Sequence, residues 1–130
     1  MNKLFSSKDL SKITQKFKKE KKKVALLHGV FDILHIGHIS YFEEIKKYSQ
    51  VLIISVTDDE YVNKGPGRPM FKIKERIKML SKIDLVDYIT VSESETAEKI
   101  IREAYSKKDA DELIAEIIKD KESSVNSESI

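Results

Sequence analysis

The sequence contains no cysteine among its 130 residues, which excludes disulfide bonds and metal sites built from thiolates. It also lacks any apolar run near the roughly eighteen residues needed to span a bilayer, and residues 1–17 lack the uninterrupted apolar core of a secretory signal. An excess of one charge is missing as well, because 24 basic residues face 22 acidic ones, whereas general nucleic-acid binders are usually basic. We therefore expect a soluble cytoplasmic protein with no membrane or nucleic-acid partner.

What is present is typical of one globular domain. Hydrophobic residues make up 40% of the chain and charged residues 35%, and this length supports a single core but not two. We place the domain over residues 1–108. Residues 109–130 predict a short amphipathic helix and then a polar, disordered tail; the apolar face of that helix would be formed by Leu113, Ile114, Ile117 and Ile118.

Apolar segments of two kinds alternate along the domain. Short apolar runs predict buried strands at residues 24–28 and 51–56, and a run that Asp87 interrupts predicts a third strand at residues 86–91. Between and around them, apolar residues recur at helical spacing; the sets are Leu10, Ile13 and Phe17, then Ile39, Phe42 and Ile45, then Ile73, Ile77 and Leu80, and last Ala97, Ile100, Ile101 and Ala104. We expect the first and last of these helices to be capped by Ser6 with Asp9 and by Ser92 with Glu95.

This alternation predicts an α/β fold. Strands joined by helices of this length form a parallel sheet through right-handed crossovers, with helices covering both faces. In such Rossmann-like sheets the ligand lies at the carboxyl ends of the strands, close to the switch in strand order. We therefore expect the site directly after the strand at residues 24–28.

All three histidines, His28, His35 and His38, stand where this strand gives way to the next helix. A helix N-terminus attracts anions because its N–H groups are unpaired and its dipole end is positive. His35 and His38 are three residues apart and can face the same side of the first turn, and Gly37 leaves room for phosphate oxygens. The alternatives are a chance spacing in which one histidine simply caps a carbonyl group, and a metal site. No third ligand stands at metal-binding spacing, so we expect no metal site built by the protein.

A basic run at residues 18–23, interrupted by Glu20, separates the first helix from the first strand. Such a run can attract phosphates, but a solvated helix end or connector is the commoner reason for it. Both interpretations stay open from the sequence.

The stretch His35-Ile36-Gly37-His38, preceded by Gly29-Val30-Phe31-Asp32, resembles the first motif of the cytidylyltransferase-like (HxGH) nucleotidyltransferases. These include glycerol-3-phosphate cytidylyltransferase and the heptose-phosphate adenylyltransferase domain. The likeness continues over roughly residues 8–104; its further parts are the strand and acidic end at 51–60, the basic glycine loop at 64–69, Glu75-Arg76, Met79-Leu80 and Val86-Asp87. Class I aminoacyl-tRNA synthetases share the tetrapeptide, but this chain is far too short to charge tRNA.

The resemblance implies a set of site residues. The catalytic ones would be His35, His38 and Lys64, and those that bind nucleotide would be Gly29, Val30, Phe31, Asp32, Gly37, Asp59, Arg68 and Arg76. Backbone groups of the turn would hold a triphosphate beside the two histidines, with Asp32 fixing that turn. Lys64 and Arg68 would reach the phosphates from a mobile loop, and Asp59 and Arg76 would line the same site.

The resemblance also implies a reaction. A phosphate oxygen of the acceptor attacks the α-phosphorus of CTP or ATP in line, and pyrophosphate leaves. Catalysis consists of alignment and of neutralising the charge on the phosphoryl oxygens, with Mg²⁺ bridging the triphosphate. The expected acceptor is a phosphorylated sugar or polyol, and the sequence does not choose between the two nucleotides.

The family pattern breaks after Tyr105. The next strand with its aspartate, the glycine turn and the serine–threonine motif of the family have no counterpart there. Because those strands pair beside the first strand in the family, we expect residues 24–28 to form an open edge that invites another chain, in a homodimer or with a partner subunit. The alternatives are a truncated, inactive nucleotide-binding remnant and an interaction module that uses residues 113–118.

Overall fold

The computed structural model describes residues 2–109 of the chain, and the predicted helix and tail beyond them lie outside the described residues. In chain order the elements are η1 (Ser7–Asp9), α1 (Leu10–Lys19), β1 (Val24–Gly29), α2 (Ile36–Lys46), β2 (Val51–Thr57), η2 (Asp59–Tyr61), α3 (Ile73–Ser81), β3 (Tyr88–Ser92) and α4 (Glu98–Ala104). No helix in this part of the chain is long and apolar enough to cross a membrane.

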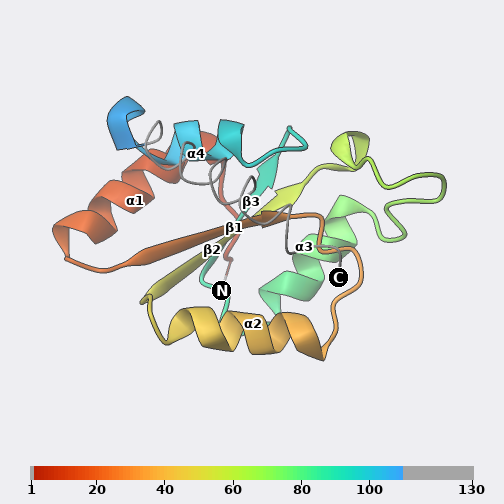
Figure 1. Ribbon diagram of the computed structural model, residues 1–130, viewed down its shortest axis with the longest axis horizontal. Coiled ribbons are helices and arrows are strands. Elements are labelled where there is room, and N and C mark those ends of the chain that lie inside the picture. The colour runs from red at the N-terminus through yellow and green to blue at the C-terminus, as the bar shows by residue number, and fades with distance from the viewer. Residues whose placement is uncertain (1, 110–130) are drawn as a thin grey trace, which may run out of the picture.

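The three strands form one parallel sheet in the order β1-β2-β3. The central strand, β2, is buried along its whole length, because it has a neighbour on each side and helices on both faces. Figure 1 shows α1 and α4 on one face of the sheet and α2 and α3 on the other. The predicted Rossmann-like α/β fold, with a parallel sheet between helices, is confirmed.

The core is divided by the sheet into two apolar clusters. Successive side chains of a strand point to opposite faces, so β2 contributes to both. Val51 and Ile53 pack with α1 and α4, whereas Leu52, Ile54 and Val56 pack with α2 and α3. Because the three strands are parallel, their carboxyl ends lie at the same end of the sheet.

The two outer edges of the sheet differ. Beside β3, the extended residues 3–5 run parallel to it: the Phe5 N–H donates to the Ile89 carbonyl at 3.0 Å, and the Ile89 N–H donates to the Lys3 carbonyl at 2.9 Å. Within residues 2–109, β1 pairs with β2 alone. All six residues of β1 are therefore partly exposed, so the strand stands at an edge as predicted, but its predicted full burial is wrong.

The predicted helix caps are also wrong. Ser6 does accept a hydrogen bond from the Lys8 N–H, but it caps the short η1 helix, and Asp9 precedes α1 without a side-chain cap. The helix α4 begins behind Ala97 and has no side-chain cap either. Neither Ser92 nor Glu95 therefore caps it, because the chain makes a longer turn between β3 and α4 than the pattern suggested.

The third strand begins two residues later than predicted because Asp87 has another role. Its carboxylate accepts a hydrogen bond from the Leu52 N–H at 2.7 Å and forms an ion pair with Lys46 at 2.6 Å. Asp87 thus ties the start of β3 to β2 and to the last turn of α2.

Candidate functional site

The turn after β1 is shaped around one aromatic side chain. Phe31 has a positive φ of 52°, a conformation that is uncommon for a residue with a side chain. Its ring lies 6.1 Å from the His38 ring and 6.2 Å from the Phe42 ring, measured between centroids. A Cβ added at Gly29 would lie 3.1 Å from this ring, so the glycine that ends β1 lets Phe31 fold back under the turn.

His35 and His38 cap the N-terminus of α2 reciprocally. The Gly37 N–H donates to His35 Nδ1 at 3.0 Å, and the His35 N–H donates to His38 Nδ1 at 3.2 Å. An imidazole nitrogen that accepts a hydrogen bond carries no proton, so the proton of each neutral ring is on Nε2. Within residues 2–109 neither Nε2 has a partner, so both can donate to a ligand.

The two rings act as a pair. Their centroids are 4.3 Å apart, and burial, together with the charge of the neighbouring His35, holds the pKa of His38 below its ordinary value. A neutral His38 keeps its Nδ1 free to accept from the backbone. The alternative that one of these histidines caps a carbonyl group is wrong, because both rings accept hydrogen bonds from backbone N–H groups.

Gly37 makes room for this arrangement. A Cβ at this position would lie 2.6 Å from Cε1 and 2.9 Å from Nδ1 of His35, closer than real side chains approach. The glycine is thus required by the cap itself, and its predicted role in the approach of phosphate oxygens stays a prediction.

His28 does not join the other two histidines. Its Nδ1 lies 3.1 Å from the Ser55 hydroxyl and its Nε2 lies 3.3 Å from the Glu95 carbonyl oxygen, on the face that α1 and α4 cover. Burial lowers the pKa of this imidazole. His28 therefore ties the loop between β3 and α4 to the edge strand.

Asp32 reaches beyond its own turn. Its carboxylate accepts hydrogen bonds from the N–H groups of Met70 and Phe71 at 2.8 and 2.9 Å, and it forms an ion pair with Arg68 at 3.3 Å. Burial of this carboxyl alone would raise its pKa, but these donors outweigh burial and the pKa lies below its ordinary value. Asp32 thus joins the turn to the base of the loop at residues 62–72, and its predicted role in fixing the turn stays a prediction.

Arg76 lies beneath the site with a side chain that is fully buried. It donates four hydrogen bonds; the acceptors are the carbonyl oxygens of Phe71, Val30 and Thr57 and the carboxylate of Asp59. One guanidinium thus joins the turn after β1, the end of β2 and the loop. The structure brings Asp59 and Arg76 together at 2.7 Å, below the turn that precedes α2.

The tip of the loop is exposed. Lys64 lies there beside Gly65 and Gly67, whose φ values of 92° and 77° favour glycine. Arg68, at the other end of the tip, is 40% exposed and held by Asp32. The two predicted phosphate-binding cations of the loop therefore differ, because Arg68 is anchored beside the turn and Lys64 is on the free tip.

The sequence analysis named Asp32 and Arg76, but it missed Phe71 and the way in which Asp32 and Arg76 act together. The Phe71 N–H donates to the Asp32 carboxylate, and the Arg76 guanidinium donates to the Phe71 carbonyl oxygen. We call this arrangement the loop clamp. The sequence shows Asp32 and Arg76 as charged residues. It does not show their hydrogen-bond partners, because those partners lie far away along the chain.

The comparisons with known proteins agree with this geometry. Two curated relatives are bifunctional HldE proteins, one from Desulfatibacillum aliphaticivorans that is 37% identical over 102 residues and one from Aliarcobacter butzleri that is 35% identical over 96 residues. The matches cover 77% and 72% of this chain but only 21% and 20% of the relatives. The chain thus spans about a fifth of the length of the curated relatives it matches.

A solved structure and a family model complete the comparison. The crystal structure of a lipopolysaccharide core biosynthesis protein from Thermoplasma volcanium superposes with a TM-score of 0.54 and 31% identity, covering 62% of this chain and 66% of that one. Residues 26–125 match the family model described as cytidylyltransferase-like. The HxGH turn, the parallel sheet and these matches together show that the chain belongs to the cytidylyltransferase-like family of nucleotidyltransferases.

Proposed function

We propose that residues 1–108 form the catalytic unit of a nucleotidyltransferase that moves CMP or AMP from CTP or ATP to a phosphorylated sugar or polyol. The observation that supports this most directly is the reciprocal cap at the start of α2. In this cap two imidazoles lie side by side, and the Nε2 of each ring lies on the side opposite the Nδ1 that accepts from the backbone. Paired donors at a helix N-terminus suit the oxygens of a phosphate chain.

The reaction needs no covalent enzyme intermediate. A phosphate oxygen of the acceptor forms a bond to the α-phosphorus while the bond from that phosphorus to the pyrophosphate oxygen breaks. His35 and His38 donate to the oxygens on which charge builds, and Lys64 adds a full charge from the loop tip. Losing one such donor costs on the order of 10²–10³ in rate.

The remaining predicted residues orient these groups. Gly29, Val30 and Phe31 supply the backbone of the turn, and the loop clamp of Asp32 and Arg76 holds that turn against the loop. Asp59 keeps the Arg76 guanidinium in place. We therefore propose that Arg68 reaches the phosphates directly, whereas Asp32, Asp59 and Arg76 contribute through position.

We propose that Mg²⁺ enters with the nucleotide. Residues 2–109 contain no group of three acidic, histidine or cysteine side chains that could hold a metal ion, and the carboxylates of Asp32 and Asp59 are already bound by protein donors. The triphosphate itself offers the oxygens that this ion prefers. The ion is then part of the substrate, where it neutralises phosphate charge.

The relatives favour a sugar phosphate as the acceptor. The similar structure comes from a protein of lipopolysaccharide core biosynthesis, and this polymer is built from activated sugars. We extend that class of acceptor to this chain and leave the base open between cytosine and adenine. Because nucleoside triphosphates are cytoplasmic metabolites, we also propose the cytoplasm as the place of the reaction.

We further propose that the chain works with a second chain. Within residues 2–109 the edge of β1 has no partner, and an open strand edge is a surface for pairing. If the chain alone binds no nucleotide, the same edge favours the alternative of a nucleotide-binding subunit that needs its partner.

Calorimetric titration with CTP and with ATP, each with Mg²⁺, tests the proposal. We expect one nucleotide to bind the wild-type protein, and a His38→Ala variant to lose that binding. A variant of an exposed lysine on α1, Lys12→Ala, serves as the matched control and should bind as the wild type does. Pyrophosphate release in the presence of phosphorylated sugars then identifies the acceptor. Failure of both nucleotides to bind the wild-type chain would overturn the enzymatic function for this chain alone.

A further inference from the structure

Within residues 2–109 two residues other than glycine have a positive φ, Lys21 at 58° and Phe31 at 52°. Lys21 follows α1, and a residue in the left-handed conformation ends many helices. The Lys22 N–H donates to the Phe17 carbonyl oxygen at 2.9 Å, and the Lys21 N–H donates to that of Lys18 at 3.0 Å. These two hydrogen bonds are the usual ones at such a helix end, so local structure explains the conformation of Lys21.

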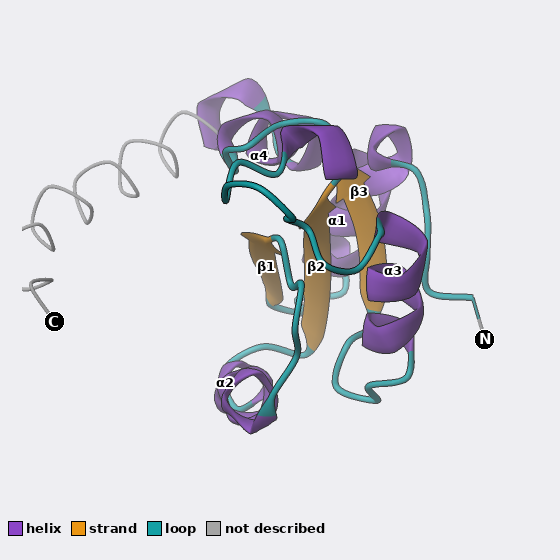
Figure 2. Cartoon of the chain, turned by 90° about the vertical axis from the view of Figure 1, so that its right-hand side faces the viewer, coloured by secondary structure: helices purple, strands orange, loops and turns teal. Residues whose placement is uncertain are grey.

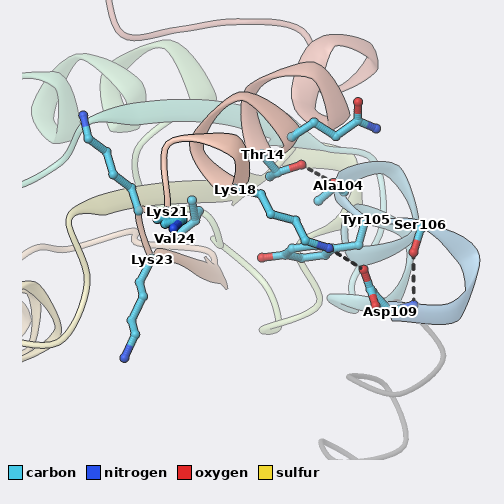
Figure 3. A pocket seen from close by; sticks show the side chains of 11 residues that line it. Thr14, Lys18, Lys21, Lys23, Val24, Ala104, Tyr105, Ser106 and Asp109 are labelled. Atoms are coloured by element: carbon cyan, nitrogen blue, oxygen red, sulfur yellow. Dashed lines mark hydrogen bonds and ion pairs between the residues drawn. The ribbon is translucent and has the colours of Figure 1, made fainter.

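The basic run that contains Lys21 does not gather around one point. It borders a cavity of about 720 Å³ between the ends of α1 and α4. Figure 3 shows that Lys21 and Lys23 point away from this cavity in different directions, while Lys18 turns toward Asp109. The absence of converging ammonium groups among the described lining residues favours the interpretation of the run as a solvated connector.

The conformation of Phe31 has a different origin, because no helix ends there. The residues on both sides of Phe31 are bound to distant segments. The Val30 carbonyl oxygen accepts from the Arg76 guanidinium at 2.8 Å, and the Asp32 carboxylate accepts from the Phe71 N–H at 2.9 Å. A left-handed conformation is strained for a bulky residue and persists where the surrounding structure imposes it. The loop clamp therefore holds the backbone of Phe31 from both sides.

This strained turn brings the Phe31 ring to the start of α2. A Cβ added at Gly29 would lie 3.1 Å from the ring, so the ring covers the glycine. The ring centroid lies 6.2 Å from that of Phe42, which is fully buried, and 6.1 Å from that of His38. Figure 2 shows the turn as the link between β1 and α2. At these separations aromatic rings attract one another, so Phe31 joins the imidazole to the apolar core.

The His38 imidazole needs such a neighbour because one hydrogen bond does not fix the plane of a ring. Its Nδ1 accepts from the His35 N–H at 3.2 Å, but the ring can still turn about that contact. The His35 ring lies 4.3 Å away between centroids and is itself held by one hydrogen bond, from the Gly37 N–H. Among the ring contacts of residues 2–109, the contact with Phe31 is the one that joins His38 to the core.

We infer that Phe31 is a positioning residue for nucleotidyl transfer, an inference that rests on the proposed function. Its ring holds the plane of the His38 imidazole and thereby sets the direction of the Nε2–H group. The backbone of Phe31 keeps the role in nucleotide binding that the family resemblance implies, whereas its side chain acts through His38. The strain at Phe31 then has a consequence, because a relaxed φ would turn the ring away from the histidine.

Two matched leucine variants test this role. Phe31→Leu keeps an apolar side chain in its cluster but removes the flat ring beside His38. Phe17→Leu makes the same change in the cluster on the other face of the sheet, where the ring lies beside Tyr88. Urea unfolding of both variants checks that they fold and measures the loss of packing that they share.

A scalar coupling across a hydrogen bond reports the position of the His38 ring without any assay of activity. At a pH where His38 is neutral, heteronuclear NMR should show a coupling between the His35 backbone nitrogen and His38 Nδ1 in the wild type and in Phe17→Leu. We expect Phe31→Leu to lose it, because the imidazole is then free to turn. A coupling that persists in Phe31→Leu, or that both variants lose, would overturn the positioning role.

A double-mutant cycle tests whether the ring acts through the histidine. Phe31→Leu should lower kcat/KM for nucleotidyl transfer about tenfold, because a misplaced donor costs rate steeply. The same change in a His38→Ala background, and Phe17→Leu in either background, should each cost less than about twofold. An equal cost of Phe31→Leu in both backgrounds would overturn the inference. If the wild type transfers no nucleotidyl group while the NMR coupling behaves as expected, the proposed function falls and the position of the ring stands.

Discussion

The two sides of the candidate site are built by different means. The histidine pair is local, because its capping hydrogen bonds join residues two or three positions apart. The loop clamp is not, because Asp32 and Arg76 join residues up to 46 positions apart. The first depends on one turn of helix, whereas the second depends on the whole sheet being in place. Substitutions in the pair should therefore affect chemistry more than stability, and substitutions in the clamp should do the reverse.

The largest expected effect is on stability, at Arg76. In an Arg76→Met variant three carbonyl oxygens and the Asp59 carboxylate lose their buried donor. We expect the free energy of unfolding to fall by about 3–5 kcal/mol, the usual cost of removing one member of a buried ion pair. Urea-induced unfolding measures it.

The matched control is Lys78→Met, which removes a cation from an exposed position of the same helix. It should change the free energy of unfolding by no more than about 0.5 kcal/mol. If Arg76→Met costs as little as this control, the guanidinium is not what joins the three segments, and the contrast between clamp and pair fails.

The second prediction concerns the pair. In His38→Ala the Nε2–H donor is lost, and we expect the rate of nucleotidyl transfer to fall on the order of 10²–10³-fold. The free energy of unfolding should fall by only about 0.5–2 kcal/mol, the cost of a lost cap. Initial rates of pyrophosphate release and urea unfolding of the same preparation give the two numbers.

A His38→Asn variant separates the two roles of this side chain. Its amide oxygen can accept from the His35 N–H, but it has no donor where Nε2 was. Compared with His38→Ala, this variant should recover the free energy of unfolding but not the rate of nucleotidyl transfer. Recovery of the rate by asparagine would contradict the assignment of Nε2 as the phosphate donor.

The same contrast explains what the sequence could predict. Strand alternation and helical spacing are local patterns, so the α/β fold and the position of the site after β1 followed from them. The histidine pair was equally visible, because His35, Gly37 and His38 are neighbours. The burial of Arg76 was not, since its four acceptors come from three separate segments.

The errors of the sequence-based prediction have the same origin. Asp87 was taken into the third strand because its apolar neighbours suggested it, whereas its long-range bonds to Leu52 and Lys46 place it before that strand. His28 was grouped with the other histidines because it is near them in the chain, but alternation along β1 turns it to the face that α1 and α4 cover. In both cases tertiary contacts overrode proximity in the sequence.

A smaller effect is expected at Asp32. In Asp32→Asn a single amide oxygen replaces two carboxylate oxygens that accept from Met70 and Phe71, and we expect a loss of about 1–2 kcal/mol. Because the loss is at the base of the loop, trypsin should cut after Lys64 about tenfold faster. The control Asp84→Asn, at an exposed position before β3, should be cut as the wild type is. Equal cleavage of all three proteins would show that the clamp does not hold the loop.

The smallest effect depends on pH and belongs to the pair. Burial and then the charge of His35 lower the pKa of His38 in the folded protein, so the folded state binds a proton less readily than the unfolded one. The stability that this cap contributes is therefore fully present above the unfolded pKa of about 6.5 and is lost as the pH falls through the folded value.

The asparagine of His38→Asn does not titrate. The stability of the wild type relative to this variant should therefore fall, by up to about 1 kcal/mol, between pH 8 and pH 5 in urea unfolding. The titration of His28 is common to both proteins and cancels. A difference that stays constant over this range would mean that the Nδ1 of His38 is not an acceptor in the folded protein, and the assignment of its Nε2–H to the phosphates would lose its basis.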